Sequence, residues 1–400
     1  MTAKSKFDAA IAGGGIVGAA CALACARRGL SVALVERDVL GSGATAAGMG
    51  HVVVMDDSEA QFALTRYSQQ LWQRMVPQLP ASAEYEPRGT LWIAADSEEM
   101  DAAQGKHAWY TARSVPCAML TADQLRKAEP NLANGMVGAL LISEDAVVYP
   151  PTVALDLAKR AQALGARLIV GKTVRAIGEG AMVLGDGSEI GAQRVILALG
   201  AESASLKPGL PVRKRKGHLV ITDRYPDFVH HQLVELGYLK SAHSVSSDSV
   251  AFNVQPRQTG QLLIGSSRQF GVESAGIDQQ ILAAMLARAR VYLPGVSRLS
   301  ALRVWTGFRA ATPDKLPLIG PDPYDPTLWL ATGHEGLGIT TSLGTAELLA
   351  DMITKGQPAI APEPYLPSRY SQSTATEQLS PNEANHEVDW SHAGTDNGIR

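Results

Sequence analysis

The stretch FDAAIAGGGIVGAACALACARRGLSVALVERD, residues 7–38, decides the fold. Its first six residues are mostly apolar and predict a short strand, and residues 16–28 predict an alanine-rich helix that a glycine closes. Residues 30–35 are apolar again and predict a second strand. The stretch therefore predicts a strand, a turn, a helix and a strand, which together make the βαβ unit of a Rossmann-like domain.

Three glycines and one acid give this unit its chemistry. Gly13, Gly15 and Gly18 have the spacing G-x-G-x-x-G, which allows a tight turn, a close approach of pyrophosphate and close packing of helix on strand. Glu36 ends the second strand, where its carboxylate can accept hydrogen bonds from a ribose hydroxyl. The N-terminus of the helix favours negative charge. The unit therefore predicts a bound dinucleotide.

The same stretch must be weighed as an export signal or a membrane helix. Residues 9–26 carry no charge and follow Lys4 and Lys6, as in a secretory signal. Three consecutive glycines would break such a helix in its middle. Nucleotide binding is therefore favoured, with no transmembrane segment.

The composition excludes several other classes. The chain has 400 residues, 46% of them hydrophobic, which is enough for two domains with substantial cores. A net charge of −3 does not suggest a nucleic-acid partner. The basic run RKRK, residues 213–216, is expected to end a loop. The three cysteines, Cys21, Cys25 and Cys117, form no metal-ligand motif, so no metal site is expected, and they fit a cytoplasmic protein.

The segments with nucleotide-site chemistry lie at the start, the middle and the end of the chain. This order predicts two interleaved domains that the chain enters more than once. The dinucleotide domain is predicted to comprise residues 1–83, 150–212 and 304–361, and a substrate domain residues 84–149 and 213–303. The rest, residues 362–400, is poor in hydrophobic clusters and is predicted to be a disordered tail.

Other elements follow from apolar patterning. Residues 41–52 are too glycine-rich for a regular element and are expected to wrap a ligand. Residues 165–178 predict one strand, and residues 84–95 and 135–148 predict strands around a helical pair. The remaining predictions are helices near 58–75, 151–164 and 278–293, strands over 217–267, and a strand, loop and helix over 328–353.

Taken in order, five motifs resemble one family. These are GGGIVG with Glu36, GSGATAAGMG, RVILALGA, GFRAATPDKLPLIG and GHEGLGIT. They resemble the FAD-dependent oxidoreductases of the D-amino acid oxidase and glycine oxidase family over about residues 7–355. The resemblance is nearest to bacterial dehydrogenases of D-amino or imino acids, including D-hydroxyproline dehydrogenases. It implies an α/β fold in which a Rossmann-like FAD-binding domain is interleaved with an α+β substrate domain built on a large mixed sheet.

The resemblance also implies which residues hold FAD. The glycine motif and the end of the second strand would hold the ADP half, the segment from Gly43 would line the ribityl chain and the flavin, and Val174 would contact adenine through its backbone. The loop that begins at Gly333 would lie beside the pyrimidine end of the flavin. The full set is Gly13, Gly15, Ile16, Val17, Gly18, Glu36, Arg37, Gly43, Ala44, Thr45, Gly48, Met49, Gly50, His51, Val174, Gly200, Gly333, His334, Gly336, Leu337, Gly338, Ile339 and Thr340.

Four residues are candidates for the substrate side. Arg309 stands where family members place the arginine that pairs with the substrate carboxylate, or it forms a structural ion pair. Asn253 replaces an aromatic hydroxyl of some amino acid oxidases. His51 would touch the flavin or the substrate, or pack in the core. Glu335 would bind an ammonium or hydroxyl group, or lie solvated in a loop.

The resemblance implies oxidation of the Cα–N bond of a small D-amino or cyclic imino acid, such as D-hydroxyproline or D-proline. The α-hydrogen would leave as hydride to N5 of noncovalently bound FAD. The alternatives are a glycine or sarcosine-type oxidase, the flavin subunit of a multi-subunit opine or glycine dehydrogenase, and an FAD-containing assembly factor.

The expected partners are a carboxylate-bearing amine and an electron acceptor, for which the resemblance favours a quinone or carrier over oxygen. Homo-oligomers and additional subunits both stay open, as does a peripheral position at the inner face of the membrane.

Overall fold

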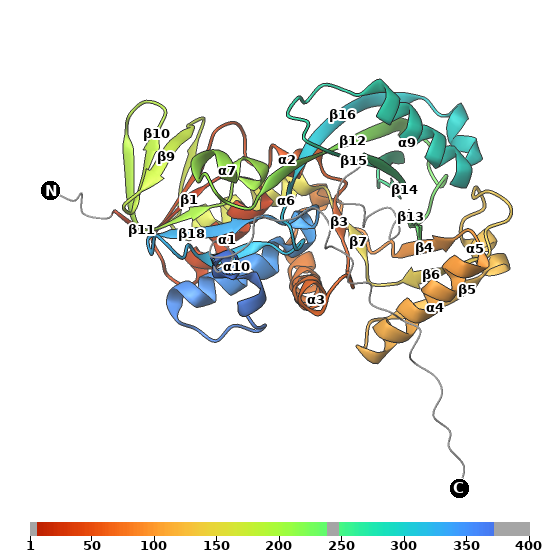
Figure 1. Cartoon of the computed structure of the whole chain (residues 1–400), viewed down its shortest axis with the longest axis horizontal. Helices are drawn as coiled ribbons and strands as arrows, with labels where there is room; N and C mark the ends of the chain where they lie inside the picture. The colour runs from red at the N-terminus through yellow and green to blue at the C-terminus, as the bar shows by residue number, and fades with distance from the viewer. Residues whose placement is uncertain (1–5, 238–247, 372–400) are drawn as a thin grey trace, which may run out of the picture.

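The computed structural model describes residues 6–237 and 248–371, which form two large sheets with helices packed on them. Figure 1 shows the first sheet and its helices on the left and the second sheet on the right. Between them lie α2 (Ala44–Ala47) and β3 (His51–Val52), the latter paired with β7 (Ala146–Val147).

The first sheet contains the predicted βαβ unit. β1 (Phe7–Ala12) lies at its centre and runs parallel to β2 (Val32–Glu36) and to β11 (Glu189–Leu197). The order is β17-β18-β11-β1-β2-β8, with β9 and β10 attached to β11. The bounds of the others are β8 (Arg167–Val170), β9 (Val174–Gly178), β10 (Ala181–Leu184), β17 (Leu318–Pro321) and β18 (Leu328–Thr332). The parallel strands β1, β2 and β18 are almost wholly buried, as expected for strands covered on both faces, whereas the edge strand β8 has no buried residue.

One face of this sheet carries a helical layer. α1 (Ile16–Arg27), α3 (Glu59–Met75), α6 (Pro150–Ala163) and α10 (Gly338–Thr354) share one apolar core with it. The alanines and cysteines of α1 are buried on nearly every side, which lets α6 and α10 approach closely.

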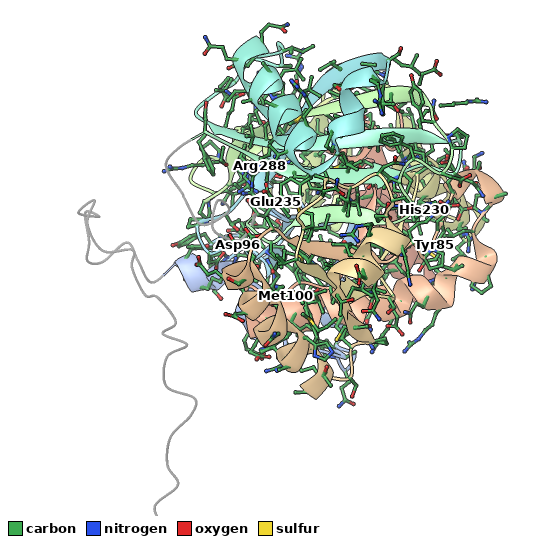
Figure 2. All side chains as sticks on the ribbon, turned by 90° about the vertical axis from the view of Figure 1, so that its right-hand side faces the viewer. Tyr85, Asp96, Met100, His230, Glu235 and Arg288 are labelled. Atoms are coloured by element: carbon green, nitrogen blue, oxygen red, sulfur yellow. The ribbon has the colours of Figure 1, made fainter. Side chains whose placement is uncertain are left out.

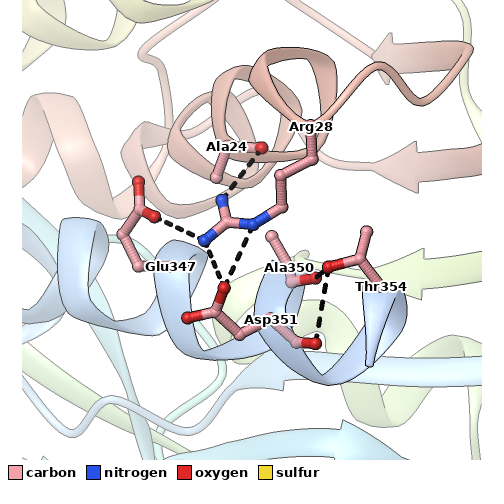
Figure 3. Close-up of polar contacts among 6 residues, drawn as sticks. All are labelled: Ala24, Arg28, Glu347, Ala350, Asp351 and Thr354. Atoms are coloured by element: carbon pink, nitrogen blue, oxygen red, sulfur yellow. Dashed lines mark hydrogen bonds and ion pairs between the residues drawn. The ribbon is translucent and has the colours of Figure 1, made fainter. Parts of the chain in front are cut away.

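An arginine ties two helices of this layer together. Arg28 caps the end of α1, and its guanidinium donates to Asp351 at 2.5 Å and to Glu347 at 2.8 Å, both on α10 (Figure 3). Because these side chains are partly buried, this ion pair is screened less than a surface pair. It joins the first helix of the chain to the last long one.

The second sheet is mixed, with the order β16-β12-β15-β14-β13-β4-β6-β5. Its only parallel pair is β13 with β4, among the described strands. The strands are β4 (Thr90–Ala94), β5 (Cys117–Thr121), β6 (Gly138–Ile142), β12 (Arg213–Arg224), β13 (Gln232–Glu235), β14 (Ser249–Pro256), β15 (Gln261–Phe270) and β16 (Ala301–Ala311). Of the described residues, three helices pack on it: α4 (Ser97–Ala112), α5 (Ala122–Ala128) and α9 (Gln279–Tyr292).

A buried carboxylate fastens α9 to this sheet. Glu235 of β13 accepts hydrogen bonds from Arg288 Nε at 2.8 Å, Tyr292 Oη at 3.0 Å and the Phe252 amide at 2.6 Å. Figure 2 shows Glu235 and Arg288 beside each other on the side of the molecule opposite the first sheet. Three donors satisfy a charge that burial would otherwise penalise.

Several local predictions need correction. RKRK does not end a loop, because residues 213–216 begin β12. Residues 165–178 form two strands, β8 and β9, and not one. Residues 41–52 are not wholly irregular, since α2 and β3 lie within them. The strand β5, which pairs with β6, was not predicted.

The tail prediction is wrong for residues 362–371. They form two short 3₁₀ turns, and Tyr365 is buried and donates from its hydroxyl to the Ala60 carbonyl at 2.6 Å. Residues 372–400 lie outside the described residues. The predicted domain boundaries stay a prediction, although the one at residue 304 would divide β16.

Candidate active site

A cavity of about 670 Å³ lies between the two sheets. At one end it is lined by the glycine turn after β1 and by the ends of β2 and β9. At the other end it is lined by side chains from β4, β12, β14, β15 and β16. The cavity therefore joins the nucleotide motif to the face of the second sheet.

The glycine turn has the predicted geometry. Gly13 has a φ of +106°, and a Cβ there would lie 2.5 Å from the Ala198 carbonyl oxygen. A Cβ on Gly18 would overlap the Gly13 carbonyl oxygen, so this residue sets how closely α1 packs on the turn. Gly15 begins α1 without a side-chain cap and lines the cavity.

The carboxylate of Glu36 lies at the nucleotide end and also holds the turn. It accepts hydrogen bonds from the Gly14 amide at 2.6 Å and from the Asp38 amide at 2.8 Å. Each carboxylate oxygen has further lone pairs, so Glu36 can still accept a hydroxyl hydrogen from the cavity side.

The predicted FAD residues come together around this cavity. Two helix N-termini face it, those of α1 and α10, and neither N-cap residue has a capping side chain. The Ile16 amide donates to Thr45 Oγ1 at 3.0 Å, and the other first-turn amides remain as donors for phosphate and for charge on a flavin. Gly43 and Gly200 leave open space where a side chain would stand. The lining includes Gly13, Gly15, Ile16, Val17, Glu36, Arg37, Gly43, Ala44, Thr45, Gly48, Met49, Gly50, His51, Val174, Gly200, His334, Gly336, Leu337, Gly338 and Ile339. These residues fit FAD.

Three predicted FAD residues do not line the cavity: Gly18, Gly333 and Thr340. Gly18 acts through helix packing, as described above. Gly333 has a φ of +80° and turns the chain after β18. Thr340 donates from Oγ1 to the His51 carbonyl at 2.9 Å, so it positions the segment that carries His51.

Arg309 lies flat against the second sheet at the other end of the cavity. Its Nη1 donates to the Ser267 carbonyl at 2.9 Å. A Cβ on Gly217 would lie 2.6 Å from that Nη1, and a Cβ on Gly336 would lie 3.2 Å from Arg309 Cδ. Two glycines therefore make the space in which the guanidinium is held.

Arg215 is a site residue that the sequence reasoning missed. It is the direct strand partner of Arg309 between β12 and β16, and it forms an ion pair with Glu335. Alternation along RKRK, which sends residues 213 and 215 to one face of a strand, was the available signal. Glu335 is buried, so the alternative of a solvated loop acid is wrong.

The pKa of Glu335 is affected both by its burial and by the arginines around it. Burial raises the pKa of the Glu335 carboxyl, and the positive charges of Arg215, Arg309 and Arg268 oppose that shift. The ion pair keeps a negative charge among several positive ones.

Two predicted histidines are neutral side chains of the lining. Burial lowers the pKa of His51 to about 4, and His51 Nε2 has no hydrogen-bond partner among the described residues. Burial also lowers the pKa of His334 to about 4, but His334 Nε2 lies 3.0 Å from Thr345 Oγ1. The ring of His51 thus keeps one nitrogen without a partner among the described residues, whereas His334 is anchored to α10.

Asn253 lies on β14 and lines the cavity. Its Oδ1 is buried without a hydrogen bond in the described part of the chain, as is Ser266 Oγ nearby in the lining. Buried polar atoms of this kind usually have a partner. The lack of partners for two buried polar atoms in the lining is consistent with a polar ligand at this end.

Comparison with known proteins gives the family. The model of the family described as "FAD dependent oxidoreductase", DAO, matches residues 8–352. The chain belongs to this family. It is therefore an FAD-dependent oxidoreductase.

Two of the relatives carry the name glycine oxidase. The chain is 30% identical to the glycine oxidase of Pseudomonas aeruginosa over 378 residues, which cover 90% of this chain and 98% of that protein. It is 27% identical to the glycine oxidase of Bacillus licheniformis, with 88% and 94% covered.

Solved structures agree with the fold. The crystal structure of glycine oxidase from Geobacillus kaustophilus matches with a TM-score of 0.82 and 26% identity, covering 92% of this chain and 100% of that one. L-proline dehydrogenase from P. horikoshii matches with a TM-score of 0.80 at 22% identity, covering 92% and 99%, which shows the shared fold alone.

Membrane-spanning helices and metal-binding clusters are both absent from the described residues. None of their helices has the length and apolar character needed to cross a membrane. They contain no cluster of three or more His, Cys, Asp or Glu side chains placed to hold a metal ion.

Proposed function

We propose that the enzyme oxidises the Cα–N bond of a small D-amino acid or cyclic imino acid, such as D-hydroxyproline or D-proline, to the imino product. The observation that carries this proposal is the position of Arg309, whose guanidinium is held over Gly217 inside the cavity. A planar guanidinium binds a carboxylate through two parallel charge-assisted hydrogen bonds. A carboxylate held there would fix the orientation of the carbon next to it.

Bound FAD supplies the acceptor for the two electrons and the hydrogen that leave Cα. The protein side chains orient the substrate. Arg309 binds the carboxylate, and Glu335, held by Arg215, faces the same end of the cavity and can accept a hydrogen bond from the amine. Asn253 offers an amide for a further polar group.

The rate of this reaction depends more on the correct placement of the substrate than on a general base. The amine enters unprotonated, and once the α-hydrogen has left with both electrons of its bond, the nitrogen lone pair forms the C=N bond. His51 is neutral above about pH 4, so it adds no positive charge that would oppose cation formation on the substrate. Orientation in a near-attack geometry supplies the main acceleration.

A second candidate is a glycine or sarcosine-type oxidase, which the glycine oxidase names of the relatives favour. The two candidates differ in the substituent at Cα. Glycine and sarcosine have only hydrogen there, so a clear preference for D-alanine or D-proline over both would support the first candidate.

The electron acceptor is proposed to be a quinone or carrier, and the cytoplasmic location stays a prediction. Rapid stoichiometric release of hydrogen peroxide would overturn this choice of acceptor. If the isolated chain holds FAD but reacts only with co-purifying subunits, a role as a subunit of a larger dehydrogenase or as an assembly factor replaces the single-chain enzyme.

The decisive measurement is anaerobic bleaching of the flavin absorbance by a panel of amino acids. We expect D-proline, cis-4-hydroxy-D-proline or D-alanine to bleach it, with their L-enantiomers as matched controls. Absence of bleaching across a broad panel of D- and N-substituted amino acids would overturn the proposal.

A further inference from the structure

The strand β12 carries a histidine on the face that points away from the cavity. Alternation along the strand places every second side chain in the cavity lining, namely Arg215, Gly217 and Leu219. His218 lies between them in the sequence, is 0% exposed and is not part of the lining. Val220, two residues further on, packs in one core with Met285 of α9. His218 therefore lies behind the cavity wall, on the side that α9 covers.

Two hydrogen bonds fix the imidazole of His218. Its Nε2 lies 3.0 Å from the Asp278 amide, which can only donate, so this nitrogen is the acceptor and carries no hydrogen. In the neutral ring the hydrogen is then on Nδ1, which donates to Ser267 Oγ at 2.9 Å. Burial lowers the pKa of the His218 imidazole, which favours this neutral form. The ring thus connects the N-cap of α9 to the strand β15.

Ser267 contacts both His218 and Arg309. The register of β12 against β15 shifts between the pair Lys216–Gln269 and the pair Val220–Ile264. Within this stretch a side chain supplies an acceptor, because the His218 amide also donates to Ser267 Oγ, at 2.9 Å. The carbonyl of the same serine accepts from Arg309 Nη1 at 2.9 Å. One residue therefore holds the histidine with its side chain and the guanidinium with its backbone.

The position of the Ser267 carbonyl depends on the hydroxyl of the same residue. Ser267 and His218 are both 0% exposed. Without Oγ, two buried donors of His218, the backbone amide and Nδ1–H, would need another acceptor, since a buried donor without one is costly. The backbone of β15 must then move towards them. A hydrogen bond weakens with changes in distance and angle, so this movement would loosen the contact with Arg309 Nη1.

We infer that His218 and Ser267 form a positioning pair, which holds the guanidinium of Arg309 in the orientation that binds the substrate carboxylate. Neither residue of the pair lines the cavity. His218 acts through the Ser267 hydroxyl, and Ser267 acts through its carbonyl. This inference rests on the proposed function, because it takes Arg309 as the carboxylate-binding residue. It extends the substrate site from the cavity wall to the N-cap of α9.

The chain offers a matched control on the same two strands. Thr222 Oγ1 accepts from the Leu262 amide at 3.0 Å, so it is also a side-chain acceptor for a backbone amide between β12 and β15, at a second shift of their register. Thr222 is 2% exposed and does not line the cavity. Ser267→Ala and Thr222→Val therefore both remove a buried side-chain acceptor, but only Ser267 also contacts Arg309.

The first test measures binding without turnover. The FAD-loaded full chain is titrated with propanoate and with propanamide, which have the same shape but differ in charge, and the shift of the flavin absorbance is followed. We expect the wild type to bind propanoate on the order of 10- to 100-fold more tightly. Ser267→Ala should reduce this ratio about 3- to 10-fold, as for the loss of one hydrogen bond, and Thr222→Val should leave it unchanged. The melting temperature should fall in both variants, so the ratio separates positioning from a general loss of stability.

Two substitutions of His218 test the other member of the pair. In His218→Asn the amide nitrogen takes about the place of Nδ1 and can still donate to Ser267 Oγ, whereas the side chain in His218→Leu cannot. We expect the propanoate-to-propanamide ratio to stay within about twofold of wild type in His218→Asn and to fall about 3- to 10-fold in His218→Leu. These two variants carry the test if Ser267→Ala does not fold.

The outcomes separate the two proposals. If the wild type binds propanoate no better than propanamide, Arg309 does not bind a carboxylate, and the proposed function and the inference are both overturned. If the wild type shows the preference but Ser267→Ala lowers it no more than Thr222→Val does, the inference alone is overturned. An equal loss of the preference in His218→Asn and His218→Leu would likewise overturn the role of His218 and leave the proposed function intact.

Discussion

Replacing Arg309 by lysine tests the proposed role of this residue most directly. Lysine keeps the positive charge but loses the planar pair of donors. In the structure one donor, Nη1, is already used by the Ser267 carbonyl at 2.9 Å, and the guanidinium lies in the space above Gly217. An ammonium group cannot bond to that carbonyl and also present two parallel donors to a carboxylate. The substitution therefore separates orientation from attraction.

The size of the effect follows from the hydrogen bonds that lysine cannot make. A hydrogen bond to a charged group contributes about 1.5–3 kcal/mol, and misplacement of the reacting carbon adds to the loss. We expect kcat/KM to fall roughly 10- to 1000-fold, which corresponds to about 1.5–4 kcal/mol. The assay is steady-state turnover with the best substrate from the panel, together with the ratio of flavin to protein absorbance and the melting temperature.

The flavin content should stay normal, because Arg309 lies at the substrate end of the cavity. Arg303→Lys on the same strand serves as the control, since Arg303 is exposed and outside the lining. Loss of FAD together with activity would show that Arg309 is structural. An unchanged kcat/KM would remove it from the site, and with it the main reason for proposing a carboxylate-bearing substrate.

Two further predictions concern the setting of the site. Gly217→Ala places a Cβ 2.6 Å from Arg309 Nη1, so KM for the substrate should rise about tenfold or more with FAD content unchanged, whereas Gly105→Ala, which meets no atom within 4 Å, should leave KM unchanged. Burial lowers the pKa of His51 and His334 to about 4. Below about pH 6.5 the unfolded chain therefore binds protons that the folded chain does not, and stability is lost as the pH falls towards 4. Relative to wild type, the melting temperature of a double His-to-Asn variant should fall less between pH 6.5 and 4.5; an equal fall would contradict the assignment of these pKa shifts.

The nucleotide end could be predicted because its signals are local. The turn that needs Gly13 and the helix that begins after Gly15 are fixed by residues a few positions apart. The same holds for α3 and α9, whose N-caps Ser58 and Asp278 stand directly before the helical residues. Such features are independent of how the rest of the chain folds.

The substrate end could be predicted only in part, because its contacts are made between distant strands. Arg309 was found through its motif, but the pairing of β12 with β16 that brings Arg215 to it joins residues about a hundred positions apart. Glu335 has no local sign of burial, since the loop acid is covered only when β16 and β12 are in place. Reading RKRK as the end of a loop hid this pairing, because a loop has no fixed faces.

The tail shows a different limit. Residues 362–371 have few apolar side chains, and their composition resembles that of a disordered segment. One buried tyrosine, Tyr365, nevertheless attaches them to Ala60 of α3, and one ion pair joins Arg369 to Asp314, which precedes β17. The amino-acid composition of a segment does not reveal single contacts of this kind, because it averages over all residues of the segment.

The location of the arginines on long strands bears on how the site works. A guanidinium carried by a mobile loop must lose its conformational freedom each time a substrate binds, and this cost weakens binding. Arg309 is held between the backbone at Gly217 and that at Gly336 and bonded to Ser267, so most of this cost is met when the chain folds. If Arg309 binds the substrate carboxylate, as proposed, the orientation of that carboxylate is then set by the paired strands β12 and β16.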